Sequence, residues 1–181
     1  MLACPLQLPD FRFQSNFWIN LHHTLYYQTQ VLETVYGLGT AHLAPMEERA
    51  YEELKRVRGE YAHDWYEALR IYRVNYASLD FVFSDTMVHI DNALARANGA
   101  DLPVHRDLPA PLQQALTLAA PAYRSSLWPH HDAGNRAFVA ELQTKANRFG
   151  PGLARRLAQL YRTPWLREPY VVDVMPYAHV C

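Results

Sequence analysis

Apolar residues recur at helical spacing along most of the chain, beginning with the segment 15–36. Its apolar positions are separated by three, four or seven residues, so they share one face of a helix. These positions are Trp18, Leu21, Leu25, Leu32 and Val35. Ser15 or Asn16 can cap this helix by accepting a hydrogen bond from a backbone N–H, and Gly37 and Gly39 end it. The pattern predicts a long helix near the N-terminus.

Further helices are predicted by the same spacing, by prolines near their starts and by glycines near their ends. They cover 45–77 with a break at Gly59, 85–97 after Ser84, 110–119, 121–127 and 129–148. Gly150-Pro151-Gly152 predicts a sharp turn, and a last helix then runs to about Tyr161. The segment 99–111 contains three prolines and is expected to be a loop. The chain is therefore predicted to be mostly α, a multi-helix, bundle-like domain.

One segment near the C-terminus departs from the helical pattern. Residues 170–175, Y-V-V-D-V-M, are rich in β-branched side chains and alternate weakly, which predicts a β-strand. A strand needs a partner for its backbone N–H and C=O groups, and no other segment is recognisable as that partner. We therefore expect a helical domain over 1–168. Over 169–181 we expect the start of a strand region that pairs with another chain or whose partner sheet is missing.

Composition narrows the class of protein. A length of 181 residues suits one domain, and half of the residues are hydrophobic, enough for a real core. With 17 Lys and Arg against 18 Asp and Glu, the net charge is -1, which argues against a nucleic-acid binder. No run of about 18 apolar residues predicts a transmembrane segment, and the first nine residues lack the features of a signal peptide. Composition leaves the compartment open.

Two segments with adjacent histidines hold the polar residues most able to do chemistry. In the first, His22 and Tyr26 are four residues apart and share a helical face. A histidine beside a tyrosine hydroxyl can transfer a proton or bind an oxyanion. His23 points about 100° away from His22, so the two are not expected to bind the same ion. The alternative is that these histidines are hydrogen-bonded where helices pack together.

The second segment is W-P-H-H-D-A-G-N-R, over 128–136. His131 shares a helical face with Asn135, and Asp132 shares one with Arg136. A carboxylate beside a histidine can orient the ring and raise its basicity. Asp132 and Arg136 can equally form a plain surface ion pair. The segment is therefore either a functional group of residues or an ordinary exposed helix face.

Other motifs are absent or isolated. The sequence contains no H-E-x-x-H zinc motif, no C-x-x-C pair, no phosphate-binding Gly-rich loop and no G-x-S-x-G nucleophile elbow. The pairs His63-Asp64 and His89-Ile90-Asp91 are typical of an exposed helix surface. The chain therefore carries no complete catalytic motif of its own.

Both histidine segments resemble landmarks of a family of poorly characterised bacterial proteins that are zinc-metallopeptidase-like. Residues 15–26, S-N-F-W-I-N-L-H-H-T-L-Y, are similar to the family phrase S-N-x-W-x-N-L-H-H-F-L-Y. Residues 128–136 are similar to W-P-x-H-D-x-x-N-R, and residues 169–177 to the approach to a third region that begins with a strand. The resemblance covers nearly the whole chain. Thr24 departs from it, because the family tends to have an aromatic residue there.

The resemblance implies that the chain is the N-terminal helical region of such a protein and ends before its H-E-x-x-H helix. Zinc is the metal of that family, but the zinc ligands are not in this sequence. Members are often exported. The resemblance also implies that the matching polar residues line a cleft or stand behind its catalytic groups. These residues are His22, His23, Tyr26, His131, Asp132, Asn135 and Arg136.

Three functions remain open. The first is a truncated metallopeptidase-like hydrolase that is inactive alone, with Arg136 able to hold a substrate carboxylate. The second is a non-enzymatic helical module whose 12 tyrosines and 4 tryptophans line a groove for a peptide, a small molecule or a partner. The third is a metal site of His22, His23, His131 and Asp132, whose ligand types suit zinc or iron. Convergence of His22, His131 and Arg136 on an open cleft favours the first, and a closed hydrogen-bonded network favours the second.

Overall fold

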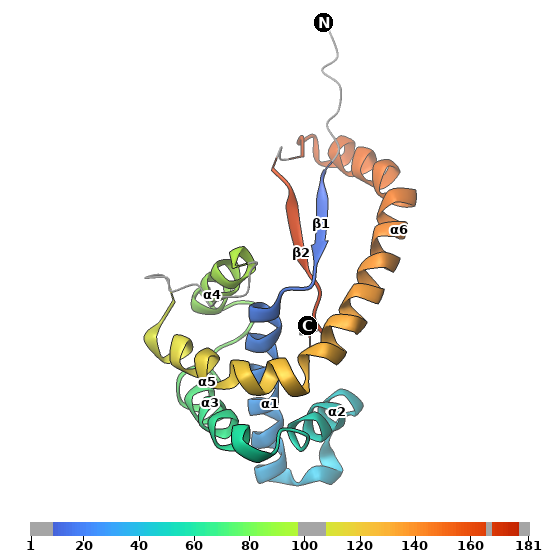
Figure 1. Cartoon of the computed structure of the whole chain (residues 1–181). Helices are drawn as coiled ribbons and strands as arrows, with labels where there is room; N and C mark the ends of the chain where they lie inside the picture. The colour runs from blue at the N-terminus through green and yellow to red at the C-terminus, as the bar shows by residue number, and fades with distance from the viewer. Residues whose placement is uncertain (1–8, 98–107, 166–167, 178–181) are drawn as a thin grey trace, which may run out of the picture.

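The computed structural model describes residues 9–97, 108–165 and 168–177, which form six α-helices and two short β-strands (Figure 1). The strands are β1 (Phe11–Gln14) and β2 (Tyr170–Asp173). The helices are α1 (Phe17–Leu38), α2 (Pro45–Leu54), α3 (Ala62–Asn75), α4 (Asp85–Arg96), α5 (Ala110–Ser126) and α6 (Trp128–Tyr161), and 3-10 turns cover Thr40–His42 and Gly59–Tyr61. The prediction of a mostly α fold is confirmed. The predicted loop over 99–111 lies outside the described residues up to position 107.

Helix α1 runs through the helical body and contacts α2, α3, α4 and α5. It begins where the sequence predicts, because Asn16 Oδ1 accepts hydrogen bonds from the backbone N–H groups of Trp18 and Ile19. Gly39, with a φ of 85°, caps its C-terminal end. From Trp18 to Tyr26 every side chain is buried, the polar ones included. The first half of α1 is therefore enclosed on all sides, and its histidines must find partners inside the protein.

The hydrophobic core lies between α1, α3, α4 and α5. Trp65 and Tyr72 from α3, Ile90 from α4 and Tyr123 from α5 are all fully buried in it. Such aromatic side chains bury a large apolar area, but their polar atoms need partners. The indole N–H of Trp65, for example, donates to Gln28 Oε1 at 3.1 Å. Trp65 and Tyr72 are therefore core residues that also reach polar groups on α1.

Strand β2 has a partner within this chain, which the sequence does not reveal. β1 lies parallel to β2, with Phe11 opposite Tyr170 and Gln14 opposite Asp173. The expectation of a C-terminal strand without a partner in the chain is therefore wrong. Strand β1 escapes notice because it is only four residues long and because a parallel pair needs a long crossover connection. Along the sequence, all six of the described helices come between the two strands. In space the strands lie next to each other, beside the far part of α6 (Figure 1).

Helices α5 and α6 are longer than predicted. Pro121 and Pro151 were expected to separate helices, but α5 continues through the first and α6 through the second. A proline removes one backbone hydrogen bond and crowds the preceding turn, and a helix can absorb both effects by bending. Figure 1 shows α6 curving, so that its far part passes alongside the strands. The predicted turn at Gly150-Pro151-Gly152 is therefore wrong, and α6 connects the helical body to the sheet.

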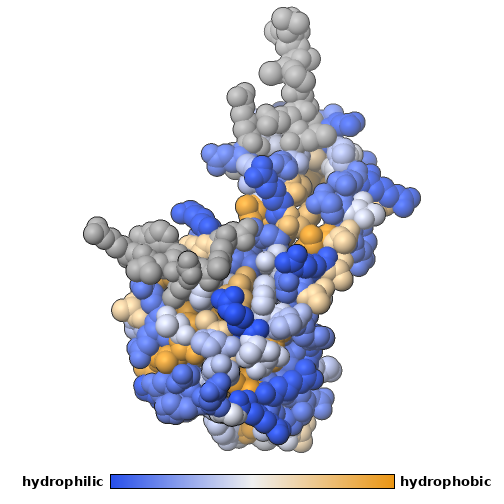
Figure 2. Space-filling model, in the orientation of Figure 1, coloured by the Kyte–Doolittle hydropathy of each residue, from blue (hydrophilic) through white to orange (hydrophobic). Residues whose placement is uncertain are grey.

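The visible surface is mostly polar, with small apolar areas spread over it (Figure 2). Its outline in this view is indented between the helical body and the column formed by the strands and the end of α6. Within the described ranges, no helix combines the length and the apolar character needed to cross a membrane.

Two glycines give opposite predictions for the same substitution. A Cβ atom at Gly134, inside α6, would meet nothing within 4 Å, whereas Gly39 has a φ of +85°. We expect Gly134→Ala to raise the free energy of unfolding by about 0.5–1 kcal/mol, because glycine weakens a helix interior. We expect Gly39→Ala to lower it by about 1 kcal/mol, because alanine disfavours that backbone conformation. Urea unfolding of both variants provides the measurement, and a stabilised Gly39→Ala variant would contradict the assigned helix end.

Candidate functional site

The two histidine segments lie in different parts of the fold. His22 and His23 on α1 face Asp91 of α4, whereas His131, near the start of α6, faces Glu53 of α2. Among the described residues, no group of three or more His, Cys, Asp or Glu side chains is arranged to hold a metal ion. The hypothesis of one metal site built from both segments is therefore wrong. Each segment instead has its own carboxylate, supplied by a different helix.

His131 belongs to a closed group of hydrogen bonds, here called the Glu53 network, with Glu53, Tyr123, Tyr177 and Arg49. His131 Nε2 lies 2.9 Å from Glu53 Oε2, and its Nδ1 lies 2.9 Å from the Tyr123 hydroxyl. Tyr177 donates to the same Glu53 oxygen, and Arg49 Nε donates to the other at 3.2 Å. Because a carboxylate only accepts hydrogen bonds, His131 Nε2 carries the proton that it donates to Glu53. Both ring nitrogens are therefore occupied.

Glu53 is only 2% exposed, yet its partners keep it ionised. Burial by itself raises the pKa of Glu53, but hydrogen bonds from His131 and Tyr177, together with the charges of His131 and Arg49, outweigh burial and lower the pKa from 4.5 to about 2. Burial also raises the pKa of both Tyr123 and Tyr177, so their hydroxyls stay protonated. The Glu53 network is therefore a satisfied structural joint between α2, α5, α6 and the segment after β2.

Asn135, four residues after His131, forms a second buried link. Its Nδ2 donates to Asn20 Oδ1 at 2.9 Å and to Ser15 Oγ at 3.1 Å. Asn20 in turn donates to the backbone oxygen of Val174 at 3.1 Å. These bonds connect α6, α1 and the end of β2. Asn135 therefore acts in packing, and it also contributes to the lining of a cavity of about 250 Å³ beside Arg49.

Asp132 and Arg136 form an ion pair on α6 in which Arg136 is exposed, whereas Asp132 is partly buried and its Oδ1 atom has no hydrogen-bond partner. Arg136 Nε donates to Asp132 Oδ2 at 2.7 Å, and the Arg136 side chain is 74% exposed. This is the plain surface ion pair, which contributes only a few tenths of a kcal/mol. His22, His131 and Arg136 therefore do not converge on one open cleft.

Tyr26 is not the partner of His22. The Tyr26 hydroxyl donates to the backbone oxygen of Leu79 at 2.7 Å. His22 Nδ1 instead lies 2.6 Å from the hydroxyl of Tyr72 on α3. The sequence spacing places Tyr26 on the face of His22, but a tyrosine from a neighbouring helix reaches the ring first. The predicted His22–Tyr26 pair is therefore replaced by a contact between helices.

A second polar group, here called the His–Asp cluster, consists of His22, His23, Asp91 and Asp173. Asp91 Oδ1 lies 3.4 Å from His23 Nε2 and 3.8 Å from His22 Nε2. All three atoms are buried without a hydrogen-bond partner, and so is His23 Nδ1. A buried polar atom without a partner costs about 1–3 kcal/mol. In contrast to the Glu53 network, the His–Asp cluster is therefore unsatisfied.

Asp173, at the end of β2, belongs to the same electrostatic environment. Gln14 on β1 donates to its Oδ1 at 2.9 Å. Burial raises the pKa of Asp173, the Gln14 hydrogen bond and His23 lower it, and the charge of Asp91 raises it; the net shift is upward. Burial and then His23 lower the pKa of His22 well below its usual value, so its ring is neutral at pH 7. The cluster thus combines two carboxyl groups with at least one neutral imidazole.

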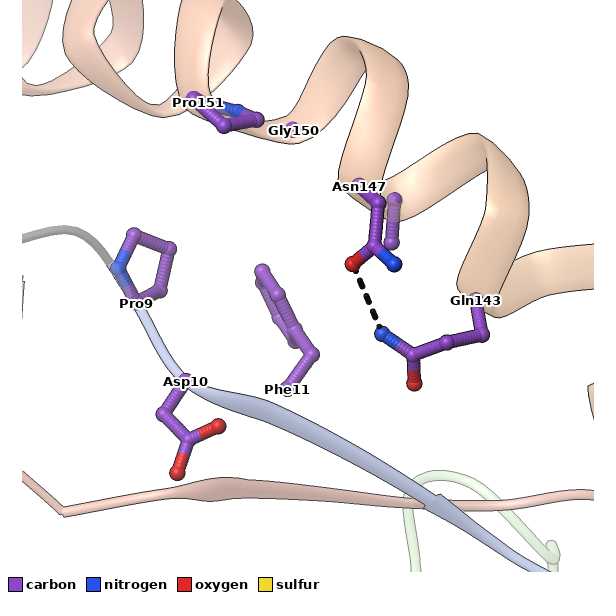
Figure 3. Close-up of a pocket in the computed structure, with 8 residues that line it drawn as sticks. Pro9, Asp10, Phe11, Gln143, Asn147, Gly150 and Pro151 are labelled. Atoms are coloured by element: carbon purple, nitrogen blue, oxygen red, sulfur yellow. Dashed lines mark hydrogen bonds between the residues drawn. The ribbon is translucent and has the colours of Figure 1, made fainter.

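Two cavities lie elsewhere on the molecule. One, of about 260 Å³, lies between β1 and α6, where Phe11 points toward Gln143 and Asn147 while Asp10 points away from α6 (Figure 3). Its polar lining is engaged internally, since Gln143 Nε2 donates to Asn147 Oδ1 at 3.0 Å. The other, of about 250 Å³, adjoins the Glu53 network beside Arg49. Neither cavity is lined by a residue of the His–Asp cluster.

No known protein family, curated protein or solved structure matches the chain. The class of protein that the fold defines is a mostly α domain that places two separate histidine–carboxylate groups in its interior. The resemblance to zinc-metallopeptidase-like proteins stays a prediction, and function has to be argued from these two groups.

The sequence indicates the histidines but not most of their partners. Glu53 sits among charged residues with the spacing of an exposed helix face, and Asp91 belongs to a pair that was interpreted as a surface pair. Glu53 and His131 are 78 positions apart, so their contact depends on how α2 packs against α6. Tyr72 and Tyr123 carry no signal beyond membership of the apolar core. The packing of α4 against α1 identifies Asp91, and the packing of α2 against α6 identifies Glu53.

The low pKa of Glu53 predicts a specific pH dependence of stability. Its folded pKa of about 2 lies below the ordinary value of 4.5, so its stabilising contribution is present above pH 4.5 and is lost as the pH falls toward 2. We expect Glu53→Gln to be less stable at pH 7, and to lose on the order of 3 kcal/mol less than the unmodified protein between pH 5 and pH 2. Urea unfolding at several pH values measures both. Glu141→Gln, at an exposed ion pair on α6, is the control, and parallel pH profiles for all three proteins would refute the role of Glu53.

Proposed function

We propose that this chain is the helical part of a metallopeptidase-like hydrolase, in which the His–Asp cluster forms one wall of a peptide-binding cleft. The observation that carries the proposal is the set of buried, unpartnered atoms on His22, His23 and Asp91. Residues that serve stability alone are expected to be satisfied, as Glu53 and His131 are. Unsatisfied polar groups that face one another are typical of a site that receives a ligand.

The position of the cluster also supports the proposal. It lies where α1, α4 and the end of β2 meet, at the base of the two strands (Figure 1). In the described part of the chain the sheet has two strands, so each strand keeps one edge at which a further strand can add. Pairing of β2 with another segment or chain at that edge would place new residues beside the His–Asp cluster. A cleft wall next to an extendable sheet suits one half of a peptide-binding site.

Hydrolysis by this chain alone is not part of the proposal. The sequence lacks H-E-x-x-H and a nucleophile elbow, so the polar wall supplies contacts and not the reacting group. Zinc, the metal of the resembling family, would be held by residues outside this sequence. The described residues would bind and orient a peptide beside it.

The second candidate function is a non-enzymatic helical module that binds a ligand or a partner. The closed Glu53 network favours it, because His131, Asn135 and Tyr123 are all hydrogen-bonded inside the protein. In that case the segment 128–136 serves to pack α6 against its neighbours. The two candidates differ in whether the His–Asp cluster contacts a peptide.

Peptide binding at the cluster tests the proposal. We expect tetra-alanine to shift the imidazole ¹H–¹⁵N signals of His22 and His23 but not those of His131, whose nitrogens are occupied. Asp91→Asn should weaken binding about tenfold, the value of one hydrogen bond to a charged group, while Glu141→Gln should leave it unchanged. The absence of any shift at millimolar peptide would overturn the proposal in favour of the second candidate. Zinc calorimetry and a peptidase assay complete the test, since submicromolar stoichiometric zinc binding lost in His131→Ala, with peptide hydrolysis, would contradict inactivity of the chain alone.

A further inference from the structure

We propose that the His–Asp cluster binds a primary ammonium group, supplied by the amino terminus of a peptide or by a lysine side chain. The inference rests on the proposed function in one respect, because it names the part of a peptide that this wall holds. It starts from the buried atoms of the cluster that lack a hydrogen-bond partner, which are Asp91 Oδ1, His22 Nε2 and both ring nitrogens of His23.

The unpartnered atoms are mainly acceptors. The Asp91 carboxylate accepts hydrogen bonds and cannot donate them. The neutral ring of His22 contacts the Tyr72 hydroxyl through Nδ1, and when Nδ1 carries the proton, Nε2 is left as an acceptor. When the His23 ring carries a single proton, it offers one acceptor nitrogen whichever tautomer it adopts. A ligand that satisfies them together must therefore be a donor of several hydrogen bonds.

The distances within the cluster suit a small donor placed among these atoms. Asp91 Oδ1 is 3.4 Å from His23 Nε2 and 3.8 Å from His22 Nε2, longer than the hydrogen-bond optimum of about 2.9 Å. An ammonium nitrogen carries three N–H donors. With a small outward turn of the Asp91 side chain, which is 26% exposed, it would replace these long separations with bonds of ordinary length to Asp91 and to an imidazole.

The cluster also lacks the cation that other carboxylates of the protein have. Glu53 pairs with Arg49, Asp132 with Arg136, and Glu141 with Lys145. In the described ranges, neither Asp91 nor Asp173 forms an ion pair with a lysine or arginine. A carboxylate in a partly buried site is stabilised by a nearby positive charge. A cationic ligand would supply the charge that no lysine or arginine in the described ranges supplies.

The layering of the cluster allows a ligand to enter from one side. The Asp91 side chain is 26% exposed, whereas that of His22 is fully buried. Asp173 is partly buried at the end of β2. The carboxylates therefore stand toward solvent and the imidazoles behind them, so a cation meets a charged group first and the histidine acceptors second.

The Phe81 ring packs against both imidazoles of the cluster. The Phe81 ring centroid lies 4.1 Å from that of His23 and 5.5 Å from that of His22. A compact ammonium group with tetrahedral donors fits this corner better than a planar guanidinium, whose five donors spread over a wider fork. We therefore expect selectivity for primary amines over guanidines.

The experiment compares four probes by calorimetry and by the imidazole signals of His22 and His23. They are tetra-alanine with a free amino terminus, tetra-alanine acetylated at the amino terminus, propylammonium and propylguanidinium; Nα-acetyl-lysine amide adds the lysine source. We expect the free peptide to bind at least about tenfold more tightly than the acetylated one, and propylammonium more tightly than propylguanidinium. Asp91→Asn and Asp173→Asn should each reduce propylammonium binding, and Glu141→Gln should not. Thermal unfolding confirms that the variants are folded.

The outcomes separate the two proposals. Equal binding of free and acetylated peptide at His22 and His23 would overturn the ammonium inference and leave the peptide-binding wall standing. Binding of propylammonium without either peptide would support the ammonium site and overturn the peptide-binding function. No response to propylammonium or to Nα-acetyl-lysine amide, with no advantage of the free amino terminus, would overturn the inference without reference to any variant. A preference of lysine amide over the free peptide would identify the side chain as the source.

Discussion

A buried carboxylate, Glu53, constrains how the helices of this protein come together. An ionised carboxyl group inside a protein is tolerated only when hydrogen bonds and charge replace the water it has lost. Glu53 obtains these from His131, Tyr177 and Arg49, and the first two of these partners lie on elements other than α2. Any packing that separated α2 from α6, or moved the segment after β2, would leave the charge uncompensated. The hydrogen bonds that Glu53 needs therefore hold α2, α6 and the segment after β2 together.

The His–Asp cluster differs from the Glu53 network because several of its buried polar atoms have no hydrogen-bond partner. Both contain histidines facing a carboxylate from a neighbouring helix, yet only the Glu53 network fills both nitrogens of its histidine. In the cluster, His23 has neither nitrogen bonded and Asp91 Oδ1 has no partner. Two arrangements of the same residue types thus point to different roles. The satisfied one fixes structure, and the unsatisfied one is the place where binding energy remains to be gained.

Features that depend on neighbouring residues can be predicted from this sequence, whereas contacts between distant segments cannot. The cap at Asn16, the break near Gly59 and the strand from Tyr170 are local, and the structure confirms them. Pro121 and Pro151 mislead, because a helix can continue through a proline by bending. The short strand β1 and the carboxylates of both histidine groups depend on contacts between distant segments, which no local spacing encodes. His22 and His131 were therefore found as residues, but their separation into two sites was not foreseen.

The parallel pairing of β1 with β2 determines whether the His–Asp cluster exists at all. Gln14 lies opposite Asp173 in this register and donates a hydrogen bond to it. A shift of one residue would turn every β2 side chain to the other face of the sheet, and Asp173 would leave the neighbourhood of His23 and Asp91. Asn20 and Asn135 oppose such a shift, because Asn135 bonds to Asn20 and Asn20 bonds to the backbone of Val174, directly after Asp173. Asn20 and Asn135 thus bond to each other and hold β2 in the register that places Asp173 in the cluster. The segments 15–26 and 128–136 are therefore joined through their asparagines and not through their histidines.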